Sequence, residues 1–504
     1  MGRDLHAPAA SRLPVASPAA NCRFQGGCGG PVPPELPDDV AAKVKNHPCY
    51  SEEAHHHFAR MHVAVAPACN IQCHYCNRKY DCANESRPGV VSERLSPSQA
   101  LAKVLAVAKE VPELAVVGIA GPGDPLANPG PTFETMELVK RAAPDLQLCL
   151  STNGLALPDH VDGIAALGVG HVTVTVNMTD PEVGERIYPW VAWKGRRLVG
   201  RDAAKLLSER QLEGIARLRE KGILCKVNSV VIPGVNDAHL PEVSRRVMAL
   251  GAFTHNLMPL ISAPEHGTFY GCTGQAGPTR EELEAVQACC EGTARVMRHC
   301  RQCRADAVGL LGQDRNAEFA LSRLPPEPAQ DVPDVRRAHR AGVERVRALA
   351  AQARDEALSR LAGAPPDLRA RVAVATKGGG TVNEHFGHAR EFQVYEASPS
   401  GARFLSHRKV GSYCQGGEGE EDVLDAVLRA LSDCQAVLVA RVGHCPKGRL
   451  AAAGIEPVTE FAHQPVEAAV LSWFGTFAGC VARGEVRART PASSEPFGSE
   501  AQVA

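Results

Sequence analysis

The stretch Ala68-Cys69-Asn70-Ile71-Gln72-Cys73-His74-Tyr75-Cys76-Asn77-Arg78-Lys79 decides how the rest of this chain is interpreted. Its three cysteines have the spacing C-x3-C-x2-C and follow the apolar run 62–67. Three thiolates this close can ligate three irons of a cubane iron–sulfur cluster. The fourth iron then has no protein ligand and is open to a small molecule. A structural zinc site is the alternative, but zinc sites usually pair two C-x2-C halves, and no second half lies nearby.

The composition of the chain is that of an ordinary globular protein. At about 150 residues per domain, 504 residues are enough for roughly three domains. The formal net charge of −1 predicts neither a nucleic-acid surface nor a membrane surface. Because no apolar run is long enough to span a bilayer and no signal-peptide core is present, we expect a cytoplasmic protein. Thiols stay reduced there, so part of the 18 cysteines is expected to bind metal.

The cysteine spacing, with Tyr75 just before the third cysteine, resembles the cluster loop of radical S-adenosylmethionine (SAM) enzymes. In that family the open iron binds the amino and carboxylate groups of SAM. The reduced cluster then cleaves SAM to a 5′-deoxyadenosyl radical. The resemblance implies that Cys69, Cys73 and Cys76 are catalytic and hold a 4Fe–4S cluster bound to SAM.

Residues 97–310 alternate between helical and strand patterns, as parallel βαβ units do. Strands are expected near residues 114–120, 147–151, 171–177, 223–231 and 252–258. The fold class is therefore α/β, and six such units predict a partial (β/α)6 TIM-like barrel, the architecture of radical SAM enzymes. Functional side chains collect at the carboxyl ends of the strands in such barrels.

Polar residues at these strand ends are the candidate SAM contacts. Gly121-Pro122-Gly123-Asp124-Pro125 resembles the glycine-rich motif that receives the SAM amino group, with Asp124 where the family usually has Glu. On the next strand Gln147, Cys149, Ser151 and Asn153 alternate with leucines, which predicts that this polar set faces the lumen. Asn177 and Asn228 can contact SAM or instead cap a turn. The predicted SAM-binding residues are Gly121, Gly123, Asp124, Ser151, Asn153, Asn177 and Asn228.

Further cysteines are placed for metal binding. Cys49 and Cys82 flank the trio and are interpreted as thiols for a second metal centre, with histidines beside Cys49. Cys149 is predicted to point into the lumen. Cys300 and Cys303 form a C-x2-C pair, a strong ligand signal in a cytosolic chain, with a redox dithiol as the alternative. These thiols are enough for two additional clusters around one barrel.

Together these features closely resemble the nitrogenase cofactor biosynthesis proteins within the radical SAM family. The match covers about residues 41–310 and is carried by 47–50, 54–58, 61–82, 87–91, 121–125 and the pair Cys300 and Cys303. Such proteins fuse two 4Fe–4S precursor clusters into an 8Fe cofactor precursor. They insert a carbide that derives from the methyl group of SAM, and a second SAM supplies the radical that activates this methyl.

The resemblance also implies ligands and partners. Cys49 and Cys82, with a histidine taken to be His55, would hold one precursor; His56 and His57 are close alternatives, and His47 is constrained by the following proline. Cys149, Cys300 and Cys303 would hold the other precursor. The implied partners are SAM, iron–sulfur cluster donors, cofactor carrier or scaffold proteins of nitrogenase assembly, and a reductant such as a ferredoxin or flavodoxin.

The remaining segments differ in composition. Residues 1–40 and 483–504 are expected to be disordered, and 311–367 to form a linker and a charged, solvated helix. Residues 368–482 predict a smaller mixed α/β domain that resembles the NifX-like cofactor carriers. Its implied role is transient cofactor binding, with a purely structural domain as the alternative. The candidate contacts are His385, His388, Cys414 and Cys445.

Two other functions stay open at this point. A non-catalytic iron–sulfur scaffold needs the cysteines but not the motif at 121–125 or the polar strand ends. A radical SAM maturase with auxiliary clusters would act on a peptide instead of on a cluster. Cleavage of SAM under reducing conditions separates the scaffold from both enzymes.

Overall fold

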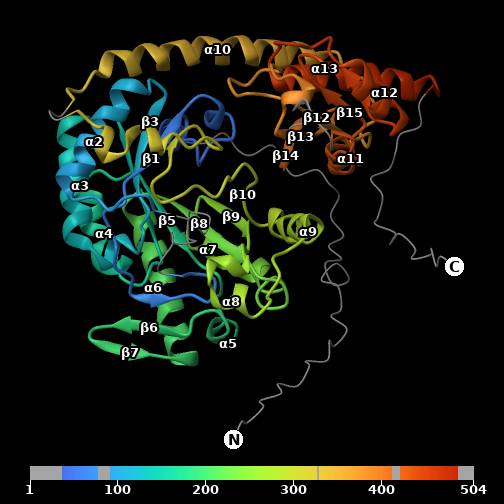
Figure 1. Ribbon diagram of the computed structural model, residues 1–504. Coiled ribbons are helices and arrows are strands. Elements are labelled where there is room, and N and C mark those ends of the chain that lie inside the picture. The colour runs from blue at the N-terminus through green and yellow to red at the C-terminus, as the bar shows by residue number, and fades with distance from the viewer. Residues whose placement is uncertain (1–36, 78–90, 326–328, 411–419, 486–504) are drawn as a thin grey trace, which may run out of the picture.

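The computed structural model of the chain describes residues 37–77, 91–325, 329–410 and 420–485. Most of the predicted arm and tail lie outside these residues, as do Cys82 and Cys414. The first described element is helix α1 (Asp38–Val44). Two folded domains follow, and one long helix runs from the first to the second (Figure 1).

The larger domain is built on an eight-stranded, mostly parallel sheet. The strand order is β10-β9-β8-β5-β4-β3-β1-β11, and β11 pairs antiparallel with β1. Within the described residues β10 and β11 do not pair with each other, so the predicted partial barrel is confirmed. The strands are β1 (Ala59–His62), β3 (Leu114–Ile119), β4 (Gln147–Thr152), β5 (His171–Thr175), β8 (Leu224–Val231), β9 (Thr254–Pro259), β10 (Val296–Met297) and β11 (Val308–Gly309).

Helices cover the outer face of this sheet, and their sequences explain where they begin. Ser96 and Gln99 form a reciprocal capping box at the start of α2, and Thr279 and Glu282 do the same for α9. The long helices are α2 (Pro97–Glu110), α3 (Pro129–Ala142), α4 (Leu157–Ala166), α6 (Gly200–Glu220), α7 (Leu240–Ala249) and α9 (Arg280–Glu291). The short ones are α5 (Pro181–Glu185) and α8 (Phe269–Cys272).

The two faces of the barrel strands differ in polarity as the alternation predicted. Leu148 and Leu150 pack into the large core under the helices. Cys149 lies instead in a small cluster with Ala54 and Phe58, from the segment before β1. The lumen face of β8 is also polar, because its Lys226 and Asn228 line a cavity inside the barrel.

A small sheet that the sequence did not predict lies at the carboxyl end of the barrel strands. Strands β6 (Trp190–Trp193) and β7 (Arg196–Leu198) form a hairpin, and β2 (Ile71–Gln72) pairs with β6. Figure 1 shows this hairpin at the bottom of the molecule, below β5 and β8. Because β2 lies within the cysteine loop, its pairing with β6 anchors the loop on the side away from β1.

The opposite end of the barrel is filled by the segment before β1. The hydroxyl of Tyr50 lies within hydrogen-bond distance of the carbonyls of Val172 (3.4 Å) and Leu224 (3.3 Å). The ring centroid of His47 lies 4.3 Å from that of His171. These contacts are made near the beginnings of β5 and β8, so residues 47–58, including the turn Ala54–His56, plug the barrel from its amino-terminal side.

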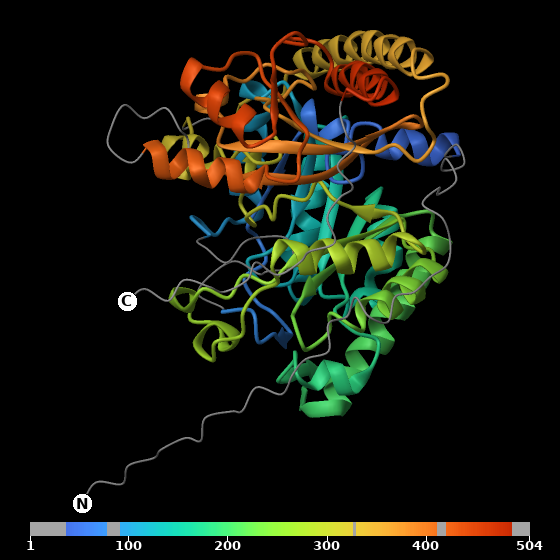
Figure 2. The same cartoon turned by 90° about the vertical axis from the view of Figure 1, so that its right-hand side faces the viewer.

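Helix α10 (Pro333–Ser359) joins the two domains and is not the fully solvated helix that its charge predicts. Arg336 is completely buried and pairs with Asp145 and Asp331 at 2.6 and 2.8 Å. Val343 packs with Phe58 in the cluster that contains Cys149. One face of α10 therefore closes the plugged end of the barrel, as the two views in Figures 1 and 2 agree.

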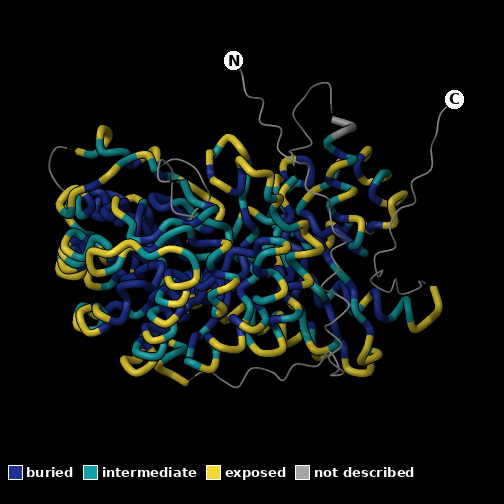
Figure 3. The backbone as a smooth tube through the Cα atoms, turned by 90° about the horizontal axis from the view of Figure 1, so that it is seen from below, coloured by how far each residue is buried: buried dark blue, intermediate teal, exposed yellow. Residues whose placement is uncertain are grey.

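The carboxyl-terminal domain is a mixed α/β domain, as predicted. Its five-stranded sheet has the order β14-β13-β12-β15-β16, with antiparallel pairs on one side of β12 and parallel pairs on the other. Figure 3 shows a buried interior in both domains. The elements are β12 (Ala370–Val374), β13 (Glu391–Ser398), β14 (Gly401–Lys409), α11 (Glu420–Ala430), β15 (Ala436–Leu438), α12 (His444–Ala452), β16 (Glu456–Val458) and α13 (Val466–Ala482).

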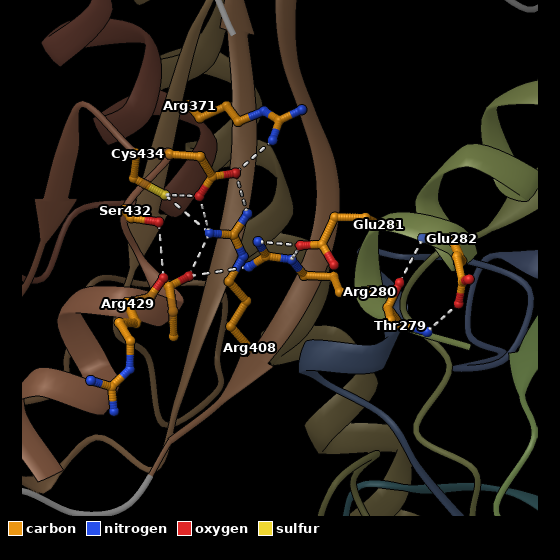
Figure 4. Close-up of polar contacts among 11 residues, drawn as sticks. Thr279, Arg280, Glu281, Glu282, Arg371, Arg408, Arg429, Ser432 and Cys434 are labelled. Atoms are coloured by element: carbon orange, nitrogen blue, oxygen red, sulfur yellow. Dashed lines mark hydrogen bonds and ion pairs between the residues drawn. The ribbon is translucent and has the colours of Figure 1, made fainter. Parts of the chain in front are cut away.

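The two domains also touch directly. The amide of Gly379 donates to the carbonyl of His56 at 3.1 Å, and Arg403 pairs with Glu291 at 3.0 Å. A further contact joins Arg280, at the start of α9, to the carbonyl of Ala430 at 3.4 Å. Figure 4 shows Arg280 beside Arg408 of the carboxyl-terminal domain. Among the described residues no helix is both long and apolar enough to cross a membrane.

Candidate active site in the barrel lumen

The cysteine trio lies on a loop after β1 that is fixed by its own contacts. Gln72 donates from Nε2 to the carbonyls of Cys73 and Cys76, at 3.0 and 2.8 Å. Asn177 donates to the hydroxyl of the buried Tyr75 at 2.8 Å. With β2 paired to β6, the loop is held on both sides, and all three cysteines belong to or pack against the same apolar cluster.

The three thiols interact electrostatically. Cys73 is 5% exposed, and burial, reinforced by the neighbouring Cys76 and Cys69, raises the pKa of its thiol well above the ordinary value. Grouped thiolates in a buried loop repel one another unless a cation binds them, and metal binding releases their protons. This donor set fits a cubane iron–sulfur cluster with one iron open, as the sequence predicted.

The predicted glycine-rich motif packs directly against this loop. The amide of Gly123 donates to the carbonyl of Ala66 at 2.6 Å, and the amide of Asp124 donates to that of Ala68 at 2.8 Å. A Cβ at position 123 would lie 2.1 Å from the carbonyl oxygen of Ala68. Position 123 therefore requires glycine because two backbone segments meet there.

Asp124 braces the ends of two strands. Its carboxylate is fully buried and accepts hydrogen bonds from the Thr152 hydroxyl (2.9 Å), the Asn153 amide (2.6 Å) and the Leu126 amide (2.9 Å). Burial raises the pKa of Asp124, although these hydrogen bonds oppose the rise. The Asp124 carboxylate joins the glycine-rich motif to the end of β4. These contacts indicate that Asp124 stabilises the cysteine loop through the motif.

The other predicted SAM contacts have different surroundings. The side chain of Asn153 lies beside the trio, 2.7 Å from Asn70 Oδ1 and 3.8 Å from Cys69 Sγ. The hydroxyl of Ser151 is buried and has no hydrogen-bond partner among the described residues, so it stays a predicted contact. The amide of Asn177 is fully used by Tyr75, Tyr188 and the backbone of β8, which does not fit the predicted contact with SAM.

A small cavity lies inside the barrel and brings three of the predicted auxiliary cysteines together. Its lining residues are Cys49, His62, Lys226, Asn228, Asn256, Met258, Met297, Cys300, Arg301, Cys303 and Leu311. Asn228, predicted as a SAM contact, belongs to this cavity. Cys300 also packs against the apolar cluster that contains Cys73, so the cavity adjoins the cysteine loop.

Basic and amide groups point at the cavity sulfurs. Arg60, which is 2% exposed, donates from Nε and Nη2 to the sulfur of Cys303 at 3.1 and 3.0 Å. Asn256 donates to the sulfur of Cys300 at 3.2 Å. Hydrogen bonds to sulfur and nearby cations favour thiolates and the anionic clusters that thiolates bind. The lining therefore suits an iron–sulfur group.

Cys149 is not among the described residues that line this cavity, and its grouping with Cys300 and Cys303 stays a prediction. Its cluster contains Ala54, the residue before His55. The plug segment fills the lumen beside the first half of β4. His55 is 4% exposed, and its Nε2 has no hydrogen-bond partner among the described residues. The Nε2 of His47 is also without a partner there.

Two family models match the chain. Residues 63–247 match the Radical SAM superfamily, and residues 368–475 match the family described as Dinitrogenase iron-molybdenum cofactor. Among curated relatives, the FeMo cofactor biosynthesis protein NifB of Herbaspirillum seropedicae is 58% identical over 91% of this chain and 87% of its own length. The NifB of Azotobacter vinelandii is 55% identical, over 87% of this chain and 89% of its own length.

The chain belongs to the NifB family. The NifB of Bradyrhizobium diazoefficiens agrees, with 56% identity over 93% of both chains. Among solved structures, methylornithine synthase (PylB) aligns at 16% identity with a TM-score of 0.33, over 51% of this chain and 68% of its own. The predicted family resemblance is confirmed: this NifB-family chain is a radical SAM enzyme of FeMo cofactor biosynthesis with a NifX-like domain.

In this NifB-family chain the sequence did not predict Lys226, which lines the cavity, or Arg60, which donates to the sulfur of Cys303. Lys226 and Asn228 alternate with the buried Cys225 and Val227, so a lysine on the polar side of a strand was the available signal. The sequence around Arg60 gives no such signal. Strand β1 has only four residues and all four are buried, so no alternation of polar and apolar faces marks Arg60. Its role depends on Cys303, which is 243 residues away in the sequence.

Proposed function

We propose that this enzyme fuses two 4Fe–4S precursor clusters and inserts a carbide derived from SAM, which yields the 8Fe precursor of the nitrogenase cofactor. The observation that carries this proposal is the shared lumen. A cavity lined by Cys49, Cys300 and Cys303 adjoins the loop of Cys73, so a group bound to these thiols lies next to the radical SAM site.

Cys69, Cys73 and Cys76 would hold the resident 4Fe–4S cluster, and its open iron would take SAM. When bound, this group supplies one-electron reductive cleavage of SAM. Gly123 and Asp124 keep the loop against β3 and β4, and Asn153 presents its amide beside Cys69. Ser151 supplies an unpaired hydroxyl on the lumen face of β4.

The precursor clusters are the substrates, and the cavity is suited to hold them loosely. Cys300 and Cys303 offer two thiols to one precursor, with Arg60 and Asn256 donating to their sulfurs. Fewer protein ligands leave bridging sulfides exposed, so the clusters can be methylated, joined and released. Arg60 and Lys226 add positive charge that offsets the anionic clusters.

The other precursor would be held by Cys49 and His55, with Cys82 as predicted from sequence. The packing of Cys149 with the turn at 54–58 supports its assignment to this precursor instead of to the Cys300 and Cys303 group. Cluster donors, a reductant such as a ferredoxin or flavodoxin, and carrier proteins would serve the reaction. The carboxyl-terminal domain would hold the product before transfer.

The test is anaerobic turnover of reconstituted chain with SAM and a reductant. We expect 5′-deoxyadenosine and a protein-bound 8Fe product from the wild type. The double substitution Cys300→Ala and Cys303→Ala should keep SAM cleavage and lose the product, and Cys225→Ala, which changes a thiol under the outer helices, should keep both. A chain that produces no 5′-deoxyadenosine would be a scaffold, and one that abstracts hydrogen from a peptide would be a maturase.

A further inference from the structure

The stretch 186–201 beside the cysteine loop is strongly basic. It contains four arginines, one lysine and no acidic residue, in a chain whose formal net charge is −1. It includes strands β6 and β7, whose register leaves Lys194 and Gly195 as a two-residue turn. Both turn residues have a positive φ, 48° and 74°, as the favoured tight hairpin turns require. This turn holds Lys194 and Arg196 exposed at the tip of the hairpin.

The exposed cations of the hairpin are not neutralised by neighbouring carboxylates. Arg197 lies over the ring of Trp190, 4.8 Å from its centroid. Within the described ranges no carboxylate pairs with Lys194, Arg196 or Arg197. Arg201, by contrast, pairs with both glutamates of α5. The hairpin therefore presents a local excess of positive charge on a chain that is nearly neutral overall.

The basic stretch is hydrogen-bonded to the cysteine loop. The amide of Ala192 donates to the carbonyl of Asn70 at 2.8 Å, and the amide of His74 donates to the carbonyl of Ile187 at 2.9 Å. These two contacts lie on either side of Cys73 in the sequence. The positively charged surface is thus built on the backbone that positions the trio.

An exposed aromatic ring adjoins the same loop. Phe269 on α8 is 53% exposed, and its ring centroid lies 4.1 Å from that of His74, in the middle of the cysteine loop. The hydroxyl of Tyr270 donates to the carbonyl of Arg186 at 2.7 Å, so α8 adjoins the basic stretch. Arginines and exposed aromatic rings are enriched in protein interfaces. Figures 1 and 2 show this part of the molecule at the end of the barrel away from the carboxyl-terminal domain.

We propose that an acidic electron-carrier protein, a ferredoxin or a flavodoxin, docks on the face made of Arg186, Lys194, Arg196, Arg197 and Phe269. We name this surface the donor face. The inference rests on the proposed function, in which such a carrier reduces the cluster of the trio. One electron passes from the reduced carrier to the 4Fe–4S cluster, so the carrier is oxidised by one electron and no proton or bond moves.

Two physical reasons favour this partner at this place. Electron transfer slows steeply with distance, and the donor face is hydrogen-bonded to the loop that binds the cluster. Unpaired positive charge also attracts an acidic protein and speeds its encounter, and salt screens this attraction. A small, charged and salt-sensitive interface is typical of transient electron-transfer complexes.

The first measurement is the affinity of reconstituted full-length chain for an oxidised ferredoxin and an oxidised flavodoxin, both of net negative charge, by isothermal titration calorimetry. We expect the wild type to bind one or both, more weakly as ionic strength rises. The double reversal Lys194→Glu and Arg196→Glu should weaken this binding about tenfold at low ionic strength. The control Arg337→Glu with Arg345→Glu makes the same charge change on exposed residues of α10 and should leave the affinity unchanged.

The second measurement separates docking from the chemistry at the trio. With dithionite as the reductant, the wild type and the double reversal should release 5′-deoxyadenosine at the same rate, which also shows that the variant is folded. With limiting reduced carrier, the double reversal should be about tenfold slower than the wild type. Lys194→Gln with Arg196→Gln should give a smaller loss, which covers the case that the reversed variant folds poorly.

The outcomes separate this inference from the proposed function. If neither carrier binds the wild type, or if the double reversal leaves binding unchanged, the inference is overturned, and product formation with dithionite still tests the proposed function. A labelled RNA that binds this face when neither carrier does would assign the face to nucleic acid and also overturn the inference. If dithionite yields 5′-deoxyadenosine without an 8Fe product, the proposed function fails, and carrier binding still decides the inference.

Discussion

Arg301 of the barrel and Glu391 of the carboxyl-terminal domain form a two-point ion pair at the domain junction. Arg301 lies in the loop between Cys300 and Cys303, and 12% of its side chain is exposed. Bidentate pairs of this kind fix geometry as well as contribute energy. Through this ion pair, the carboxyl-terminal domain helps to fix the loop that carries the predicted cluster ligands Cys300 and Cys303.

Replacing Glu391 with Gln should therefore loosen the loop at 300–303. We expect faster hydrogen exchange there and lower iron retention by the auxiliary sites, while SAM cleavage stays within about twofold of wild type. The matched control is Glu396→Gln on the same strand, since Glu396 pairs with the half-exposed Arg403. Equal hydrogen-exchange rates at residues 300–303 in the Glu391→Gln and Glu396→Gln variants would show that the ion pair of Arg301 and Glu391 does not hold this loop in place.

The same carboxylate predicts a pH dependence of stability. Burial disfavours its charge, but hydrogen bonds from His407 and Arg301 outweigh burial and lower the pKa of Glu391 to about 2. A carboxyl whose pKa is lower in the folded state stabilises that state above its unfolded pKa. This contribution, on the order of 2 kcal/mol, is lost as pH falls from about 4.5 towards 2.

Urea unfolding of metal-free chain between pH 7 and pH 3 measures this contribution. The difference in unfolding free energy between wild type and Glu391→Gln should shrink as pH falls below about 4.5. A difference that stays constant across this range would mean that Glu391 has no special role in joining the domains.

Gly123 predicts a sharp local effect on the cysteine loop. Gly123→Ala places a Cβ 2.1 Å from the carbonyl oxygen of Ala68, so the loop must move away from the motif. We expect at least a tenfold loss of SAM cleavage and loss of the cluster of the trio, measured by iron content and 5′-deoxyadenosine. Gly130→Ala on α3, where a Cβ meets nothing within 4 Å, should leave both unchanged. Normal cleavage by Gly123→Ala would contradict the close packing of these segments.

Arg336 predicts a large effect on stability far from the site. Arg336→Ala removes the partner of Asp145 and Asp331 and should cost about 3 kcal/mol of unfolding free energy, because both carboxylates stay partly buried. Arg337→Ala, whose side chain is 73% exposed, should cost under about 0.5 kcal/mol. Chemical denaturation of both variants decides whether α10 is part of the barrel or a free linker.

The strands and helices of the barrel were predictable because their periodicity is local. The predicted strand at 147–151 is β4, and its alternation correctly assigned Leu148 and Leu150 to the outer core. The small sheet β2-β6-β7 was not predicted, because β2 has two residues and its partner lies more than a hundred residues away. The burial of Arg336 was also missed, since one of its aspartates, Asp145, lies 191 residues away in the sequence.

In the candidate site too, contiguous sequence motifs were predictable and contacts between distant segments were not. The trio and Gly123 are contiguous motifs, so their proximity followed from the barrel topology. Arg60 and Asn256 donate to sulfurs of the loop between β10 and β11, and no local pattern relates them to it. Cys149 faces the lumen as alternation requires, but only packing shows that the turn at 54–58 lies against it.

The central claim is that one barrel lumen holds a radical SAM cluster and two precursor clusters together. Iron and sulfide quantification with Mössbauer spectroscopy, on full-length chain reconstituted anaerobically, tests it most directly. We expect three 4Fe–4S clusters per wild-type chain and two in the double variant Cys300→Ala and Cys303→Ala. A single cluster in the wild type, lost only when Cys69, Cys73 or Cys76 is replaced, would contradict it.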